Sequence, residues 1–254
     1  MFGLKNKNGS CWINAALQGM FRIPELQKRF AENAEDTKNP VEVCLSEIYG
    51  SRGEEGLRDL YDCVKTRTMP AGEGIGDSNE LLEFICDKVP FLDKLLRFKV
   101  AHTIKCAHCD YNDTRNDTVI EFDIAPTRPK MTLSESIVEA TKPFSVAEWK
   151  CEKCNRLGCT KQLLVGSFPK ILTFHLTSMD TTVTYSPQIV LNGNTYALLA
   201  VLSFDGSHWK TFGRDMPPGQ PWHCFNDQHV QSFDPKHFPL VDTMRLLMYY
   251  RINE

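Results

Sequence analysis

Hydrophobic and polar residues in the first hundred positions follow the spacing of helices rather than that of strands. Asp77 and Glu80 stand three residues apart at the start of one such segment, as in a capping box. Pro24 opens another segment, and Pro90 is interpreted as a stop. Five helices are therefore expected, over residues 11–20, from 24 onward, and over 41–49, 54–64 and 77–89.

From residue 99 onward the hydrophobic period changes to two. Ile120, Phe122 and Ile124 alternate with more polar positions, which predicts a strand with one buried face. Further strands are expected in the segments rich in β-forming residues, 163–176 and 196–204, and a short helix over 132–140. Helices first and strands later indicate an α+β protein, with a cleft between a helical lobe and a sheet lobe.

The composition fits an intracellular globular protein. The chain has 254 residues, 42% hydrophobic and 24% charged, which is enough to bury one large core or two small ones. Its first ten residues are mostly polar and rich in glycine and asparagine, and it lacks an apolar run of about 20 residues, so we expect no signal peptide, no membrane contact and a cytoplasmic or nuclear location. A net charge of −3 without a visible basic patch argues against a nucleic-acid partner.

Four of the ten cysteines form two C-x-x-C pairs, Cys106 with Cys109 and Cys151 with Cys154. Four thiolates are the ligand set of a closed, structural Zn²⁺ site, whereas a catalytic zinc needs an open position. Each pair follows a candidate strand, so two hairpin tips could meet around one ion and hold a small sheet together. The same pattern fits a zinc-ribbon interaction module, which is therefore carried as a function of a different class.

A turn rich in glycine and asparagine places Cys11 on the first turn of a helix, where the helix dipole is expected to lower the thiol pKa. This placement alone also suits a structural cysteine, so a base must be found elsewhere. His208 lies between two strand-like stretches, and Asn226 and Asp227 end the next one. Cysteine, histidine and Asn/Asp follow in the order found in papain-like proteases, with His208 taking the thiol proton and Asn226 or Asp227 fixing its tautomer.

The remaining histidines are expected to have no catalytic part. His223 is the nearest rival of His208, but it stands too close in sequence to Asn226 to be the base. The others have no comparable neighbours in the sequence: His102, His108, His175, His229 and His237.

With these residues assembled, the chain resembles the ubiquitin-specific protease family from residue 3 to residue 251. The family's opening box, Gly-Leu-x-Asn-x-Gly-Asn-Thr-Cys-x-x-Asn-x-x-Leu-Gln, is matched by Gly3, Leu4, Asn6, Cys11, Asn14, Leu17 and Gln18. Residues 77–82 are similar to its Gln-Asp-Ala-x-Glu-Phe-Leu element, 149–154 to its second zinc knuckle, and 169–176 to the strand that follows. These four elements in the right order make chance agreement improbable.

The resemblance implies a papain-like cysteine protease fold of the α+β class, with a helical thumb (about 1–98), zinc-bearing fingers and the start of a palm (99–176), and the β-rich palm (177–254). It implies a thiol-dependent deubiquitinase that hydrolyses the (iso)peptide bond after the C-terminal Gly-Gly of ubiquitin, with ubiquitin or a ubiquitin-like modifier and its conjugates as partners. By position, Cys11 is the nucleophile, His208 the base and Asn226 the third member with Asp227 beside it, and Asn6 is an oxyanion donor.

Departures from the family pattern bear on the substrate. Gly-His-Tyr becomes Ser207-His208-Trp209, Gly-Asn-Thr becomes Asn8-Gly9-Ser10, and Gly76 stands where the family has glutamine before Asp77. The loop before His208 is also short. A protease for another modifier such as SUMO is therefore an alternative, as is an inactive ubiquitin-binding module, although every catalytic position carries a competent residue.

A Gly-Gly tail requires a channel too narrow for side chains and walled by apolar residues. Trp12 beside the nucleophile and Trp209 beside the base are the candidate walls. The alternative, that both are core aromatics, carries equal weight because tryptophan usually buries its ring.

Overall fold

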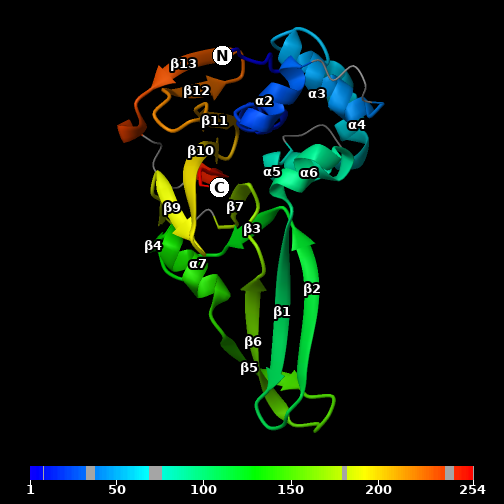
Figure 1. Cartoon of the computed structure of the whole chain (residues 1–254), viewed down its shortest axis with the longest axis vertical. Coiled ribbons are helices and arrows are strands. Elements are labelled where there is room, and N and C mark those ends of the chain that lie inside the picture. The colour runs from blue at the N-terminus through cyan, green and yellow to red at the C-terminus, as the bar shows by residue number, and fades with distance from the viewer. Residues whose placement is uncertain (8, 33–37, 69–75, 179–181, 238–242, 254) are drawn as a thin grey trace.

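The computed structural model describes residues 1–7, 9–32, 38–68, 76–178, 182–237 and 243–253. Asn8, in the turn before Cys11, lies outside the described residues. Figure 1 shows three parts: a group of helices, a large sheet beside it, and a narrow second sheet that extends away from both. Among the described residues, all α-helices but one short one come from the first hundred positions, so the expected order of helices before strands is confirmed.

The helical part contains the five expected helices and a sixth: α1 (Cys11–Met20), α2 (Pro24–Ala31), α3 (Pro40–Gly50), α4 (Leu57–Thr68), α5 (Ser78–Lys88) and α6 (Pro90–Leu96). Every residue of α1 is buried. It packs between α5 on one side and the strands β10 (Asn194–Phe204) and β11 (Trp209–Gly213) on the other. A helix enclosed on all sides in this way gives its first residue a fixed position.

Three details of the helices differ from expectation. Pro90 does not stop the helical region but is the first residue of α6, where its missing N–H costs no helical hydrogen bond. α4 begins at Leu57 rather than at residue 54. Asp77 caps α5, but its side chain accepts a hydrogen bond from the Asn79 N–H instead of forming the expected pair with Glu80.

The larger sheet has the strand order β13-β12-β11-β10-β14-β7-β3, and β9 pairs with β10. Besides β10 and β11, its strands are β3 (Glu121–Ile124), β7 (Ile171–Leu176), β9 (Gln188–Leu191), β12 (Trp222–Asn226), β13 (His229–Phe233) and β14 (Met244–Arg251). Successive residues of its central strands point to opposite faces. Leu202 and Met248 belong to the hydrophobic cluster shared with the helices, whereas Val201 and Leu247 belong to a second cluster on the far face.

Residues 163–176 are two strands rather than one stretch. β6 (Leu157–Val165) lies in the narrow sheet and β7 in the large one. The short helix expected over 132–140 is α7 (Leu133–Thr141), and Thr132 and Glu135 form both halves of its capping box. Smaller elements in the described part of the chain are β4 (Lys130–Thr132), β8 (Thr182–Thr184) and a 3-10 turn (Pro235–His237).

The narrow sheet has the order β2-β1-β6-β5, with β1 (Phe98–Cys106), β2 (Asn112–Val119) and β5 (Phe144–Lys150) beside β6. Cys106 ends β1 and Cys151 follows β5, so each C-x-x-C pair lies at the tip of a hairpin. Because β1 pairs with β6, with Cys106 opposite Cys159, the two tips lie side by side at the far end of the sheet (Figure 1).

Within the described ranges, no helix combines the length and hydrophobicity needed to cross a membrane.

Candidate active site

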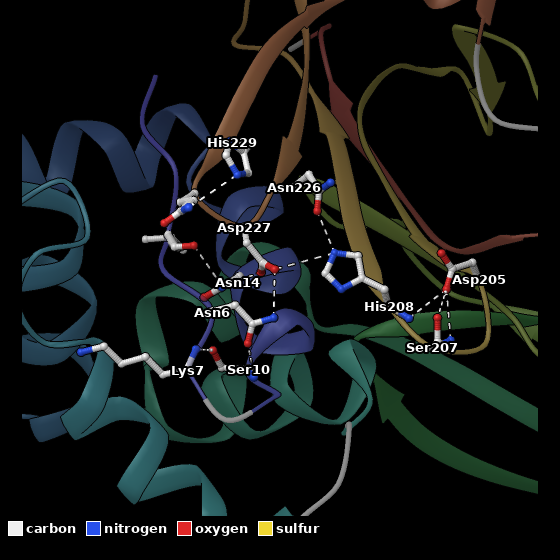
Figure 2. Close-up of polar contacts among 12 residues, drawn as sticks. Asn6, Lys7, Ser10, Asn14, Asp205, Ser207, His208, Asn226, Asp227 and His229 are labelled. Carbon is white, nitrogen blue, oxygen red and sulfur yellow. Dashed lines mark hydrogen bonds and ion pairs between the residues drawn. The ribbon is translucent and has the colours of Figure 1, made fainter.

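The segment before α1 folds into a compact turn that places Cys11 at the helix start. The side-chain oxygen of Asn6 accepts a hydrogen bond from the Ser10 N–H at 3.0 Å, and the Ser10 hydroxyl accepts one from the Lys7 N–H at 3.0 Å (Figure 2). Gly9 has a φ of +79°, a conformation that glycine adopts without steric cost. Cys11 is then the first residue of α1 and is 2% exposed.

Burial raises the pKa of the Cys11 thiol above its ordinary value, and the negative charge of Asp227 raises it further. A hydrogen bond from the backbone N–H of Trp209, next to His208, opposes both effects. The expectation that the helix start lowers the pKa of Cys11 is therefore wrong, because burial of the thiolate outweighs the backbone hydrogen bonds of Trp12 and Cys11 at the helix start. The thiol is protonated at rest and needs a base to become a nucleophile.

His208 is held at the tip of the β10–β11 hairpin by Asp205. Oδ1 of Asp205 accepts hydrogen bonds from the Ser207 N–H at 3.1 Å, the Ser207 hydroxyl at 2.9 Å and the His208 N–H at 2.9 Å. Gly206 provides the positive φ of +94° that the turn requires. The loop that looked short in the sequence is thus a rigid turn that delivers His208 toward the start of α1 (Figure 2).

The imidazole of His208 contacts both candidate orienting residues through the same nitrogen. Nε2 lies 2.7 Å from Oδ1 of Asn226, the last residue of β12, and 3.7 Å from Oδ2 of Asp227. β12 pairs with β11, which begins one residue after His208, and this pairing brings the end of β12 near the turn that carries His208. With an amide oxygen as its acceptor, Nε2 carries the ring proton and Nδ1 has the lone pair that can take a proton.

Asp227 connects three separate parts of the chain. Its φ of +52° turns the backbone sharply between β12 and β13. Its carboxylate accepts a hydrogen bond from Asn6 Nδ2 at 2.9 Å and one from Asn14 Nδ2 at 2.8 Å, and its carbonyl accepts one from the Leu4 N–H at 3.0 Å. Asn6 therefore has one amide N–H engaged with Asp227. No role is predicted for Asn14 from the sequence, although it stands in the opening box.

Asn6, His208, Asn226 and Asp227 line a cavity of about 230 Å³ together with Gln228 and His229. The structure thus brings together the side chains predicted for base, orienting group and oxyanion donor. Cys11 is linked to this group from the helix side by the hydrogen bond of the Trp209 backbone and by the charge of Asp227, both of which act on its thiol.

The two tryptophans predicted as channel walls have different surroundings. Trp12 is fully buried in the helical core, and its indole lies so close to Gly76 that a Cβ there would come within 2.7 Å of the ring. Its predicted place in an open channel is therefore wrong. Trp209 is 3% exposed and stacks on Phe204 with 4.9 Å between ring centroids, but it is among the residues that line a second cavity of about 400 Å³.

His175 lines this second cavity and is not the isolated histidine that the sequence suggested. Its Nδ1 lies 2.9 Å from Oδ1 of Asp123 and 3.8 Å from Oε1 of Glu121, which also accepts a hydrogen bond from Asn79 Nδ2 at 2.7 Å. Burial raises the pKa of Glu121 to about 7. No local sequence pattern could indicate this cluster, because His175 and Asp123 are 52 positions apart and meet through the parallel pairing of β3 with β7.

The four knuckle cysteines lie together as predicted, with all four sulfurs within 4.8 Å of one another. Sγ of Cys106 is 3.7 Å from that of Cys154, and Sγ of Cys109 is 3.7 Å from that of Cys151. A tetrahedral ion with Zn–S bonds of about 2.3 Å separates its sulfurs by about 3.8 Å, so the residues present fit a metal ion. His108 lies beside them, but its Nε2 is 2.9 Å from the Leu157 carbonyl oxygen.

Comparison with known proteins gives the family context. No protein-family model matches the chain. It is 26% identical over 205 residues to ubiquitin carboxyl-terminal hydrolase 47 of Drosophila melanogaster, covering 70% of this chain and 13% of that protein. It is 24% identical over 276 residues to ubiquitin carboxyl-terminal hydrolase 7 of Drosophila melanogaster, covering 91% of this chain and 24% of that protein. The chain thus spans a quarter or less of these relatives.

Solved structures give the fold. The deubiquitinating module of SAGA, composed of Ubp8, Sgf11, Sus1 and Sgf73 and bound to monoubiquitin, matches with a TM-score of 0.82 at 18% identity, covering 100% of this chain and 69% of that chain. The same module bound to ubiquitin aldehyde also gives 0.82. The α+β papain-like architecture with thumb, palm and fingers is thereby confirmed. This chain is related in sequence to ubiquitin carboxyl-terminal hydrolases and has the fold of a ubiquitin-specific protease catalytic domain.

Proposed function

We propose that this chain is a cysteine protease that hydrolyses the (iso)peptide bond after the C-terminal Gly-Gly of ubiquitin. One observation carries the proposal. Cys11 begins a buried helix and contacts the backbone beside His208, whose ring is hydrogen-bonded to Asn226 on the neighbouring strand. Cys11, His208 and Asn226 thus supply a thiol nucleophile, a base and an orienting group in one rigid arrangement.

The proposed reaction begins when Nδ1 of His208 takes the proton of the Cys11 thiol. The thiolate attacks the carbonyl carbon of the last glycine, and the histidine then gives its proton to the leaving amine, which leaves a thioester on Cys11. Water activated by the same histidine hydrolyses the thioester and releases the glycine carboxylate. Asn226 keeps the ring in the required tautomer throughout.

Asn6 is the proposed side-chain donor to the oxyanion. Its amide oxygen is fixed by the Ser10 N–H and one of its amide hydrogens by Asp227, so the direction of the second N–H is set as well. A donor whose orientation is fixed before reaction stabilises developing charge without reorganising.

We further propose that Zn²⁺ occupies the site of Cys106, Cys109, Cys151 and Cys154. A closed four-thiolate site supplies structure and no chemistry of its own. The ion would join two hairpin tips in a narrow sheet that has exposed side chains on most of β2 and β5, and so would stabilise a region with little core.

We propose ubiquitin rather than another modifier as the substrate because of the proteins that this chain resembles. Those that match in sequence are named as ubiquitin hydrolases, and the modules that match in fold are bound to monoubiquitin or ubiquitin aldehyde. Two alternatives can be distinguished from this proposal by experiment. One is a protease for SUMO or a similar modifier, and the other is a binding module without activity.

The test is reaction of the purified chain with propargyl-terminated ubiquitin and SUMO probes side by side, with the Cys11→Ala variant as control. We expect ubiquitin to be captured on Cys11 and the variant to be inert. Capture by the SUMO probe alone would assign the chain to that modifier. Binding of ubiquitin without capture or turnover would leave a binding module and reject the enzyme. His208→Ala should reduce turnover nearly as much as Cys11→Ala.

A further inference from the structure

Asn14 contacts the candidate site from inside the nucleophile's own helix. It lies three residues after Cys11, its backbone N–H bonds to the Ser10 carbonyl, and its side chain is 3% exposed. Nδ2 donates one hydrogen bond to Oδ1 of Asp227 at 2.8 Å and one to the Leu4 carbonyl at 3.2 Å. Figure 2 shows Asn14 beneath Asp227, next to Asn6.

The orientation of the Asn14 amide follows from its neighbours. Both partners of Nδ2 are oxygens without a hydrogen to donate, so a flipped amide would place oxygen against oxygen at both contacts. In the observed orientation Oδ1 is buried without a hydrogen-bond partner among the described residues. An apolar residue of similar volume would avoid that unsatisfied acceptor. The amide is therefore suited to donating toward Asp227 rather than to stabilising the core alone.

Asp227 depends on such donors for its position. Its charge is met by the amides of Asn6 and Asn14 and, at 3.7 Å, by the ring of His208. The two amides reach it from different sides, one from the turn that precedes Cys11 and one from the helix that follows. Removal of the Asn14 contact would leave Oδ1 of Asp227 without its donor, and the carboxylate to which Asn6 donates would be held from one side alone.

We propose that Asn14 is a positioning residue: from the helix of Cys11 it fixes the carboxylate of Asp227, which in turn orients Asn6 and faces His208. The inference deepens the proposed hydrolysis and rests on it. Because Asn14 aligns groups around the reacting carbonyl, its removal should lower kcat and leave KM nearly unchanged.

The test is a donor–acceptor exchange. Asn14→Asp places a second carboxylate against Asp227. The pair of Asn14→Asp with Asp227→Asn restores a hydrogen bond of reversed direction between these two positions at unchanged net charge, while the hydrogen bond to the Leu4 carbonyl is lost in both variants. Gln18→Glu is the matched control, since Gln18 is 1% exposed on the same helix and donates to the Phe2 carbonyl at 2.9 Å, with its Oε1 likewise unsatisfied among the described residues. Each variant is assayed for hydrolysis of a fluorogenic ubiquitin substrate and for its melting temperature.

We expect Asn14→Asp to lower kcat on the order of 100-fold with KM nearly unchanged. The exchanged pair should have a kcat at least about tenfold higher than that of Asn14→Asp alone. Gln18→Glu should lower the melting temperature about as much as Asn14→Asp does, and leave kcat near the wild-type value. Asn14→Ala removes both hydrogen bonds without adding charge. If Asn14→Asp does not fold, Asn14→Ala replaces it in the test and should likewise lower kcat with KM nearly unchanged. An equal loss of kcat in the Gln18 control, or no recovery in the exchanged pair, would overturn the proposal.

A second readout does not need ubiquitin. The rate of alkylation of Cys11 by iodoacetamide, followed across pH by peptide mass spectrometry, reports its thiolate directly. Asn14→Asp should move this profile to higher pH, because a second negative charge disfavours the thiolate, and the exchange should return it. If the wild-type chain cleaves no modifier but the profiles shift and return, the proposed function fails while the positioning of Asp227 by Asn14 stands; profiles that do not move reject it.

Discussion

His208, in the turn before β11, and Asn226, at the end of β12, are joined by a hydrogen bond of 2.7 Å, whereas Asp227, one residue further on, stays 3.7 Å from the same nitrogen. The adjacent residues thus have separate partners. Asn226 is hydrogen-bonded to the His208 ring, and Asp227 accepts hydrogen bonds from Asn6 and Asn14. Strand pairing explains the difference, because Asn226 ends β12 and Asp227 has already turned away from it.

Asn226→Ala is therefore expected to lower kcat by about ten- to a hundredfold, less than Cys11→Ala or His208→Ala. The carboxylate of Asp227 is near enough to Nε2 to take over part of the orientation of the ring. Steady-state kinetics on a ubiquitin substrate measure the effect. A loss at Asp227→Ala with full activity in Asn226→Ala would show that Asp227 is the orienting residue.

Alkylation of Cys11 should be slow at neutral pH and accelerate as the pH rises. Burial and the charge of Asp227 raise the pKa of its thiol, so the thiolate fraction at pH 7 lies below that of a free cysteine and grows only at higher pH. Asp227→Asn removes one of these causes and should shift the profile to lower pH. Iodoacetamide labelling read by peptide mass spectrometry measures both profiles. A thiol already fully reactive at pH 6 would contradict the expectation.

One zinc per chain is expected, and Cys151→Ser should abolish its retention. Sulfur pairs at 3.7 Å already have the separation that a tetrahedral ion requires. Removal of the metal should unfold the narrow sheet and weaken binding of the modifier, while Cys11 in the helical part stays reactive toward iodoacetamide. Elemental analysis gives the stoichiometry. A metal-free chain whose melting temperature is indifferent to Cys151→Ser would show that the four cysteines are not a metal site.

The sequence predicted features that depend on local spacing and missed those that depend on distant contacts. The helix at Cys11 and the two cysteine knuckles follow from residues a few positions apart. The contact of Asn14 with Asp227 joins residues 213 positions apart, and no periodicity reports it. The direction of the Cys11 pKa was missed for a related reason: the helix dipole can be inferred from sequence, but the burial that overrides it depends on strands near the other end of the chain.

The contact between Gly76 and Trp12 provides the last prediction. The family's glutamine is replaced by glycine at this position, and the indole of Trp12 occupies the space into which a side chain would project, so that a Cβ on residue 76 would lie 2.7 Å from the ring. Gly76→Ala should therefore push the ring or the segment before α5 aside. Overpacking of this kind costs about 1–3 kcal/mol, so the melting temperature should fall by several degrees.

Activity should fall with it, because Trp12 follows Cys11 directly in α1. Trp12→Phe in the same background reduces the ring and is expected to recover part of the loss of Gly76→Ala, whereas Trp12→Phe alone should destabilise by leaving a void. Thermal unfolding and turnover of the two single variants and the double variant measure this coupling. Strictly additive effects would contradict a direct contact. An unimpaired Gly76→Ala variant would show that the segment before α5 can move away from the ring without cost.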